Sequence, residues 1–313
     1  MGDVWSRLKE EAREMREKEM EHFLERLNDG KAPDLRVNES IVMFTGLSSS
    51  DNLRQHYEKR KREAGGSAND LIKTVAGKLG EFIPASALGG LGPLVIAVLI
   101  DMVIYFRPEE STKDALLSVF AEEKASEVWD QIDECLKRCM MHINNDHELA
   151  TDIRRIECQL SAALTKLKNS MVRDGHMSSQ ALKAWVNGAA FHIQMLIHLV
   201  RLGGIQTCGP VESLLTTYLR DLDTLFKEHR EMVKAKSSMD AIVHKYHTLP
   251  AKFLVDGDLK LQYKMFENGG FEEYFEAYYD HRYSGQKSDI ERYFSGVRKN
   301  LQTLVDQRGY FNV

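Results

Sequence analysis

The stretch from Leu79 to Phe106 constrains the fold more than any other part of this chain, because it is the most apolar. From Ala85 onward its only charged residue is Asp101. Its second half, Leu94–Phe106, is a dense run of leucine, isoleucine and valine that would measure about 20 Å as a helix. A bilayer core needs roughly 20 residues, so this run is short for a simple span. The pattern predicts a helix covered on every side.

Three interpretations of this stretch stay open. It can be the central helix of a soluble bundle, a segment that is sheltered in one state and inserted in a membrane in another, or a constitutive single span. Asp101 would need a partner inside a bundle, and in lipid it would be protonated or line a pore. The residues expected to contact lipid are Leu94, Val95, Ile96, Val98, Leu99, Ile100, Val103, Ile104, Tyr105 and Phe106. The residues expected to act as a hinge are Gly89, Gly90, Gly92 and Pro93.

The composition favours a helical protein that stays inside the cell. The chain has 313 residues, of which 43% are hydrophobic and only six are proline. The net charge is −5 with charges of both signs, so the chain lacks the overall positive charge that is typical of nucleic-acid-binding proteins. The first residues are charged rather than apolar, so no secretory signal is expected. The start fits the loose myristoylation pattern at Gly2, but the acidic Asp3 disfavours it.

Helical spacing of apolar residues continues along most of the chain. His147–Val172 and Val211–Tyr246 keep an alternating 4-3 spacing, which is typical of a coiled coil or a long bundle, and His229 and Lys236 are polar positions in the second of these seams. Lys31–Ser50 is expected to be a linker. The expected helices are Asp3–Asn28, Asn52–Ala64, Asn69–Phe82, Ser111–Ile143, His147–Val172, Ser179–Leu202, Val211–Tyr246 and Ser288–Gln307.

Two further segments have open interpretations. The basic run on the short helix after Asn52 can be a solvated face, a nuclear-localisation tract or a patch that faces anionic lipid. It consists of Lys59, Arg60, Lys61 and Arg62. The last sixty residues are rich in tyrosine and phenylalanine and contain glycines that are expected to divide them into short helices, Gly285 among them. This segment is either an aromatic cap on the bundle or an interfacial surface.

The sequence contains no motif for phosphate binding, metal binding or nucleophilic catalysis. His192 and His198 are six residues apart, so they do not share a helix face and are expected to be satisfied polar groups. Cys135 and Cys139 share one face and are expected to be free thiols. We therefore expect no catalytic, cofactor-binding or metal-ligating residue, and an enzyme is only the third hypothesis.

The order of the parts resembles two groups of proteins. One is the α-helical pore-forming toxins of the cytolysin A type, in which long helices shelter a hydrophobic tongue; Ala85–Phe106 would be the tongue here. The other is the fish Rapunzel-like and cephalotoxin-like proteins. Their early apolar segment, charged helix and late apolar helix resemble, in that order, Leu94–Phe106, Ala121–Lys137 and Ala189–Gly204. The resemblance implies membrane activity and brings no catalytic residue.

These observations predict an all-α, elongated antiparallel bundle with long coiled-coil-like helices around a central hydrophobic helix or hairpin. Its expected segments are 1–68, 69–249 and 250–313. The function expected first is a pore-forming-like membrane protein that conditionally exposes its apolar segment. The alternative is a non-catalytic helical scaffold. The expected partners are membrane lipid, a second copy or partner helices, and the expected location is the cytoplasm with membrane association. No cofactor and no nucleic acid are expected.

Overall fold

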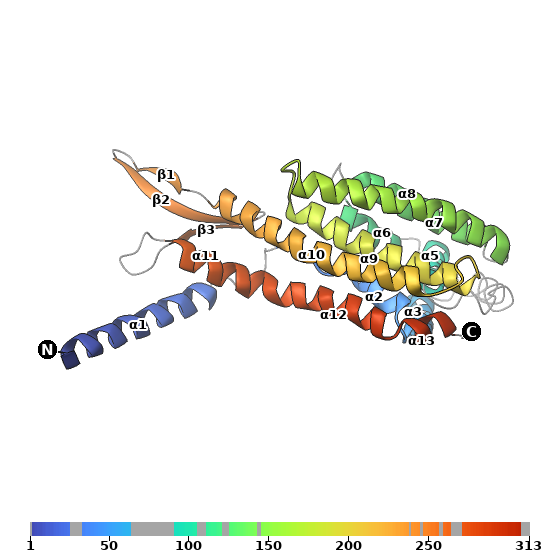
Figure 1. Ribbon diagram of the computed structural model, residues 1–313, viewed down its shortest axis with the longest axis horizontal. Coiled ribbons are helices and arrows are strands. Elements are labelled where there is room, and N and C mark those ends of the chain that lie inside the picture. Colours follow the sequence, from blue (N-terminus) through green and yellow to red (C-terminus); the bar gives the residue numbers. More distant parts are fainter. Residues whose placement is uncertain are drawn as a thin grey trace. The chain divides into compact units, whose positions relative to one another are not determined.

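The computed structural model describes residues 2–25, 33–63, 91–104, 111–120, 125–142, 145–237, 239–244, 247–256, 259–263 and 271–307 (Figure 1). The helix expected at Asn69–Phe82 lies outside these residues. The chain forms two compact units. Unit 1 contains Met1–Asp34 and Phe226–Asp289, and unit 2 contains Leu35–Leu225 and Ile290–Val313. This division differs from the three expected segments. The chain passes into unit 1 for the second time at Phe226 and out of it after Asp289, and both positions lie inside helices.

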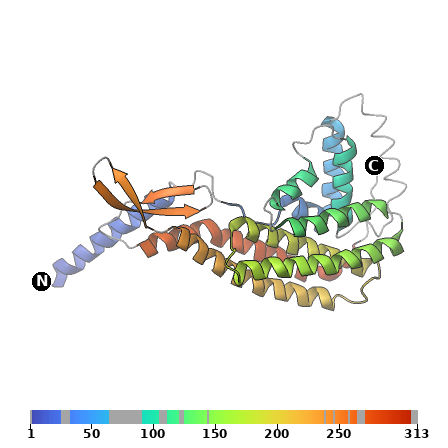
Figure 2. The same cartoon turned by 90° about the horizontal axis from the view of Figure 1, so that it is seen from above.

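Unit 2 is a helical bundle, so the all-α prediction is confirmed. Neighbouring helices α7, α8 and α9 follow one another through short connections and lie side by side (Figures 1 and 2). The helices of unit 2 are α2 (Glu39–Thr45), α3 (Ser49–Glu63), α5 (Leu91–Ile104), α6 (Thr112–Leu117), the 3₁₀ turn η5 (Ser118–Phe120), α7 (Ser126–Met141), α8 (Asp146–Val172), α9 (Ser179–Arg201), most of α10 (Gly209–Lys236), most of α12 (Gly285–Lys299) and α13 (Leu301–Asp306).

Side-chain caps set the starts of several of these helices. Asn145 caps α8 by accepting from the backbone N–H of Glu148, and Ser178 caps α9 by accepting from that of Ala181. The seam of α8 is buried as its spacing predicts, at Leu149, Ile153, Ile156, Leu160, Ala163, Leu167 and Met171. Burial of these apolar side chains, at about 25 cal/mol per Å² of apolar area, supplies most of the driving force for the bundle.

Two apolar helices occupy the interior of unit 2. Every residue of α9 from Ala184 to Leu199 is buried. In α5 the residues from Leu91 to Ile100 are buried except Leu99, and only Met102 is exposed among those whose burial is described. Helices α2, α3, α6, α7 and α9 all pack against α5. The prediction that this segment is a covered central helix is therefore confirmed for its described residues.

The close approach of α9 to α7 and α8 depends on Gly188. A Cβ atom there would lie 2.7 Å from Leu164 Cδ2 of α8 and 2.8 Å from Val128 Cγ1 of α7. Real Cβ contacts are longer than this, so the glycine lets the three helices pack more closely than any side chain would allow.

The helix expected at Ser111–Ile143 is wrong as a single element. Ser111 does cap α6, accepting from the backbone N–H of Asp114 at 3.0 Å, but the α-helix stops at Leu117. The chain continues as the 3₁₀ turn η5. There the side-chain amide of Gln180, from α9, donates to the carbonyls of Ser118 and Val119. A tertiary hydrogen bond thus replaces the continuing helix ladder.

The linker expected at Lys31–Ser50 is also wrong over its described part. Leu35, Ile41 and Phe44 are buried, and α2 is part of the bundle. Asn38 caps α2 and also joins it to α9, because its backbone N–H donates to Asn187 Oδ1 at 2.5 Å. Short apolar patches between polar residues carry too little periodicity to predict such a helix.

Unit 1 combines helices with a small antiparallel sheet. It contains α1 (Gly2–Glu25), the strands β1 (Met239–His244), β2 (His247–Asp256) and β3 (Leu259–Tyr263), the helix α11 (Phe271–Tyr279) and the π-helical turn η7 (Asp280–Ser284). The sheet order is β1-β2-β3, with Ile242 paired with Leu249 and Leu254 paired with Leu261 (Figure 2).

The helix expected at Val211–Tyr246 is wrong beyond Lys236, because a strand of the sheet follows there. Helix α10 ends at Lys236, and β1 begins three residues later. Ser237 ends the helix by donating its hydroxyl to the Val233 carbonyl and accepting from the N–H of Val255 in β2. Lys236 is exposed rather than part of a seam. Met239 and Val243 continue the 4-3 spacing, but they belong to β1, and Tyr246 lies outside the described residues.

The expected division at Gly285 is wrong as well. Helix α11, η7 and α12 form one continuous helical run from Phe271 to Lys299, and Gly285 lies inside it. The helix expected at Ser288–Gln307 is divided instead at Asn300, which separates α12 from α13.

Candidate functional site

The most informative site in unit 2 surrounds Asp101, the single ionisable residue of α5. Its side chain lies in the interior, with the whole residue 2% exposed. A charged carboxylate cannot remain there without partners, since an unpaired ion loses its hydration on burial. We call Asp101 and its three partners, His56, Arg60 and Thr112, the Asp101 cluster.

The partners of Asp101 come from two neighbouring helices. On α3, His56 Nε2 lies 2.8 Å from Asp101 Oδ1, and Arg60 Nε donates to the same oxygen at 2.9 Å. Thr112, the first residue of α6, donates its backbone N–H to Oδ2 at 2.5 Å and also donates its hydroxyl to that oxygen. Both carboxylate oxygens are therefore satisfied, and α5 is held to both helices.

The cluster keeps Asp101 ionised. Burial alone would raise the pKa of Asp101, but the hydrogen bonds from His56 and Thr112 outweigh it, so the pKa lies below its usual value. Arg60 is 4% exposed and also pairs with Glu63 at 2.9 Å. Burial opposes its charge, but the hydrogen bonds and charges of Glu63 and Asp101 together raise its pKa. The site is a buried, paired charge cluster rather than a catalytic dyad.

The cluster divides the basic run of α3. Arg60 is buried and pairs with Asp101, so it does not belong to a surface patch, whereas Lys59, Lys61 and Arg62 are exposed. Lys61 Nζ lies 5.7 Å from the centre of the Tyr57 ring. These three exposed cations of the basic run thus lie on α3, the helix whose His56 and Arg60 bind Asp101.

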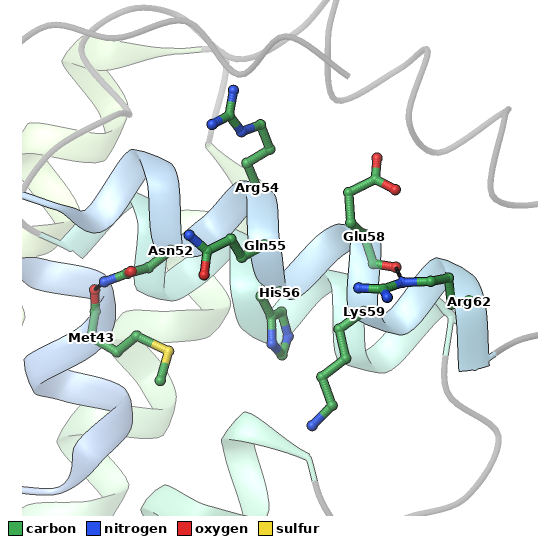
Figure 3. A pocket seen from close by; sticks show the side chains of 8 residues that line it. All are labelled: Met43, Asn52, Arg54, Gln55, His56, Glu58, Lys59 and Arg62. Atoms are coloured by element: carbon green, nitrogen blue, oxygen red, sulfur yellow. Dashed lines mark hydrogen bonds between the residues drawn. The ribbon is translucent and has the colours of Figure 1, made fainter.

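A hollow on α3 connects this basic surface with the cluster (Figure 3). Asn52, Gln55, Lys59 and Arg62 line it, and the side chains of His56 and Lys59 point downward from the helix in this view. Arg62 Nε donates to the carbonyl of Glu58 at 3.1 Å, which folds its side chain back along the helix. Three cations, Arg54, Lys59 and Arg62, outnumber the one carboxylate of the lining, Glu58, so an anion in the hollow would be attracted and would lie beside His56, which binds Asp101.

The residues expected to contact lipid lie in α5 as far as they are described. Leu94, Val95, Ile96, Val98 and Ile100 are buried and Leu99 is partly exposed. Val103 and Ile104 belong to the last turn of α5, while Tyr105 and Phe106 lie outside the described residues.

The residues expected to act as a hinge are only partly described. Gly92 and Pro93 lie in the first turn of α5, where proline fits well, and Gly89 and Gly90 lie outside the described residues.

His56, Arg60 and Thr112 were not assigned to this site from the sequence. A signal existed, because His56 and Arg60 are four residues apart and therefore share a face of the polar helix α3. A lone carboxylate in an apolar helix needs such a pair, but the sequence does not say which of several basic residues lies opposite.

His192, in the interior of unit 2, has a partner for each ring nitrogen. His192 Nε2 lies 2.7 Å from Glu157 Oε1, and His192 Nδ1 lies 2.6 Å from the Tyr218 hydroxyl. The contact with His192 lowers the pKa of Glu157, although burial partly opposes it. The expectation that this histidine is a satisfied core group is confirmed. Cys135 and Cys139 are buried free thiols.

Across the described ranges, no group of three or more His, Cys, Asp or Glu side chains is placed to hold a metal ion. In the same part of the chain, no helix is both long enough and apolar enough to cross a membrane. Comparison of this chain with family models, with curated proteins and with solved structures gives no match.

Proposed function

We propose that this protein is membrane-active and that α5 is its lipid-contacting element. The observation that carries the proposal is an apolar helix whose only charge is held by a buried cluster, with exposed cations on the helix that supplies the cluster. The sheltered state keeps α5 inside unit 2. In the active state the Asp101 cluster opens and α5 leaves its place among α2, α3, α6, α7 and α9.

Release of α5 requires an apolar acceptor. Six large side chains of α5 are buried: Leu91, Leu94, Val95, Ile96, Val98 and Ile100. Exposing each of them to water costs about 1.5–3 kcal/mol, hence about 9–18 kcal/mol together. That cost is as large as the whole stability of an ordinary domain, so α5 does not open into water. Acyl chains would accept the same surface, which makes a membrane the natural trigger.

The length of α5 limits the kind of insertion. Its 14 residues measure about 21 Å, against about 30 Å for a bilayer core. We therefore propose that the described helix enters one leaflet. Asp101 is three residues from its end, where a carboxylate can stay near the headgroups.

Acid alone is a weak trigger for this site. Because the pKa of Asp101 is lowered in the folded state, its stabilising contribution is present above the unfolded-chain value of about 3.9 and is lost only as the pH falls through the lower folded-state value. An anionic surface is the better trigger, since it attracts Lys59, Lys61 and Arg62 and competes for His56 and Arg60.

Vesicle flotation and dye release test the proposal. We expect binding to vesicles that contain phosphatidylserine and little binding to phosphatidylcholine vesicles, with binding falling as salt rises. Asp101→Asn should increase dye release at pH 7.4, because it removes the charge that holds α5 to α3. Glu212→Gln, which neutralises an exposed acid of unit 2 on α10 rather than on α3, is the matched control and should behave as wild type.

The contribution of the cations is tested separately. Replacing Lys59, Lys61 and Arg62 with glutamine should weaken binding to anionic vesicles and flatten its salt dependence. If neither wild type nor Asp101→Asn binds anionic vesicles at pH 7.4 or pH 5, the membrane proposal fails.

A second candidate function is that of a helical interaction protein. The observation that favours it is α1, whose residues from Val4 to Glu19 are all exposed. A solvated helix with an apolar stripe is suited to bind a partner helix. This function needs no release of α5 and no lipid, so the vesicle assays separate the two candidates.

A further inference from the structure

Among the described residues, α1 faces the rest of unit 1 with its C-terminal half, where a hollow between α1 and α11 begins at Arg13. Phe23 is buried and packs edge-on against Tyr274 of α11, with ring centres 5.1 Å apart. The preceding turns, from Val4 to Glu19, are exposed throughout. Isolated helices are only marginally stable in water, so these turns gain from a partner.

The exposed turns carry an apolar stripe. Trp5, Leu8, Ala12 and Met15 follow one another at a spacing of three, four and three residues, the spacing of a two-helix seam. The exposed fractions of Trp5, Leu8 and Met15 are 66%, 53% and 58%. Large apolar side chains in one line on a charged helix form a specific contact face rather than scattered exposure.

We propose that this stripe pairs with the same stripe of a second copy of the chain, as a parallel two-helix coiled coil. The inference rests on the second candidate function and names its partner. Trp5 and Ala12 take the a positions of the heptad, and Leu8 and Met15 take the d positions.

The charges beside the stripe select the parallel arrangement. In a parallel pair, a g residue faces the e residue five positions later on the other helix. Glu11 is at g and Arg16 is at e, so Glu11 of each copy faces Arg16 of the other, twice in the symmetric dimer. Val4 and Lys9 form the preceding pair, which carries no repulsion.

The antiparallel arrangement brings like charges together. If Trp5 is layered on Met15 and Leu8 on Ala12 of the other copy, Lys9 faces Lys9 and Glu11 faces Glu11. Both contacts are repulsive, whereas the parallel pair has two attractive ones. Charge complementarity therefore favours a second copy in parallel over an inverted one.

The same sequence limits the strength of the dimer. After Met15 the next seam positions are Glu19 and His22, so the contact ends before the part of α1 that packs on α11. An interface this short buries less than the roughly 1,000 Å² of a stable complex. The dimer should form at high micromolar concentrations, and more readily when several chains share one surface.

Sedimentation velocity across a concentration series tests the pairing in the full chain. We expect wild type to shift from monomer toward dimer as concentration rises. The double variant Trp5→Ser, Leu8→Ser should remain monomeric. The control Arg7→Ser, Glu14→Ser removes one charge of each sign from positions outside the seam and should associate as wild type does.

Charge exchange tests the geometry. Glu11→Arg alone and Arg16→Glu alone should each weaken association, and the combination should restore it, because the attractive pairs are re-formed with their signs reversed. An antiparallel dimer would not follow this pattern, because Glu11 already faces Glu11 there and Glu11→Arg only exchanges one like-charge contact for another. All these changes lie on exposed turns, and circular dichroism should report unchanged folding.

Three outcomes overturn the inference. A wild-type chain that stays monomeric to the solubility limit has no self-pairing. If Trp5→Ser, Leu8→Ser abolishes association but the charge exchange does not restore it, the stripe binds in another geometry and only the second candidate function survives. If that variant loses vesicle binding while wild type remains monomeric, the stripe contacts lipid instead.

Discussion

At the scale of single residues, Asp101 shows how one charge can hold an apolar helix in a protein core. Its carboxylate is fully enclosed, and its partners His56, Arg60 and Thr112 satisfy both oxygens. A buried ion pair adds little compared with apolar packing, but removing one of its members is expensive because the other charge stays behind. The cluster therefore matters less for total stability than for what happens when it is broken.

Asp101→Asn should lower the free energy of unfolding of unit 2 by about 3 kcal/mol, since it leaves the Arg60 guanidinium buried beside a neutral amide. Urea unfolding measures the loss, followed by the fluorescence of Trp185, which is buried in unit 2, in a background in which the other two tryptophans are replaced (Trp5→Phe, Trp129→Phe). The second change Arg60→Met should recover part of it, because the buried guanidinium is then absent and the Glu63 carboxylate that it leaves is partly exposed. A variant as stable as wild type would contradict this account of the cluster.

His229 carries a comparable constraint in unit 1. It is completely buried, and its Nδ1 lies 2.9 Å from the Tyr279 hydroxyl, which itself donates to the Phe226 carbonyl. Since that hydroxyl proton is already used, Nδ1 acts as the donor and the imidazole is neutral. Burial, and to a lesser extent Lys236, lowers the pKa of His229 to about 3.

Unit 1 should therefore lose stability as the pH falls. The unfolded chain takes up a proton near pH 6.5 and the folded one only near pH 3, so stability is complete above pH 6.5 and declines below it. The loss at pH 5 is about 2 kcal/mol. His229→Phe, which keeps a ring beside Tyr283, should remove most of this dependence in urea titrations at pH 7.5 and pH 5. The control His281→Gln, at an exposed position, should retain it.

At the scale of helices and strands, Gly188 and Gly296 test packing against intrinsic propensity. Gly188→Ala should destabilise unit 2 by about 1–3 kcal/mol, because the new Cβ would meet the stiff Val128 and Leu164 side chains. Gly296→Ala adds a Cβ with nothing within 4 Å inside α12, so it should stabilise by up to about 1 kcal/mol. Thermal unfolding of the two variants gives the comparison, and equal signs would refute it.

The sequence predicts elements well where caps and periodicity agree. Helices α8 and α9 were placed within one or two residues from a long seam and an apolar face, and the structure shows that Asn145 and Ser178 cap their starts. The prediction fails at Ser237, where apolar residues keep helical spacing while a hydroxyl and a neighbouring strand end the helix. It fails again at η5, where the decisive partner, Gln180, is sixty residues away.

The candidate site could be predicted only in part for the same reason. The apolar run and the need of Asp101 for a partner follow from local composition. The identity of that partner depends on how α3 rotates against α5, and this is decided by the packing of Leu53 and Tyr57, both buried, rather than by the charges. Arg60 was therefore grouped with its exposed neighbours.

At the scale of the whole molecule, the two units differ in the kinds of side chain that form their cores. Unit 2 buries aliphatic seams, whereas unit 1 buries tyrosines around Asp256, whose Oδ2 accepts from Tyr278 at 2.7 Å and from Tyr283 at 2.5 Å. Burial raises the pKa of both tyrosines, with the charge of Asp256 as a further cause, so they remain neutral donors. The expected aromatic cap is thus an aromatic core that includes a sheet.

We expect the two units to respond differently to acid. At pH 5 the hydrogen-exchange protection of backbone amides in α11 of unit 1 should be lost at lower urea concentration than that of amides in α9 of unit 2. The reason is that His229 resists protonation in unit 1, whereas Asp101 in unit 2 keeps its charge to lower pH. Coincident transitions at pH 5 would speak against separate responses.

The position of Asp101 has one more consequence. A helix that is apolar on every side gains almost the same from burial at any rotation about its axis, so burial alone would leave α5 free to turn and slide among its neighbours. The hydrogen bonds from α3 and from the start of α6 can be made together at only one angle and one height. A single acidic side chain thereby selects one orientation of α5 from many that bury the same apolar area. With leucine in its place, the helix would be well buried but would no longer have a unique orientation.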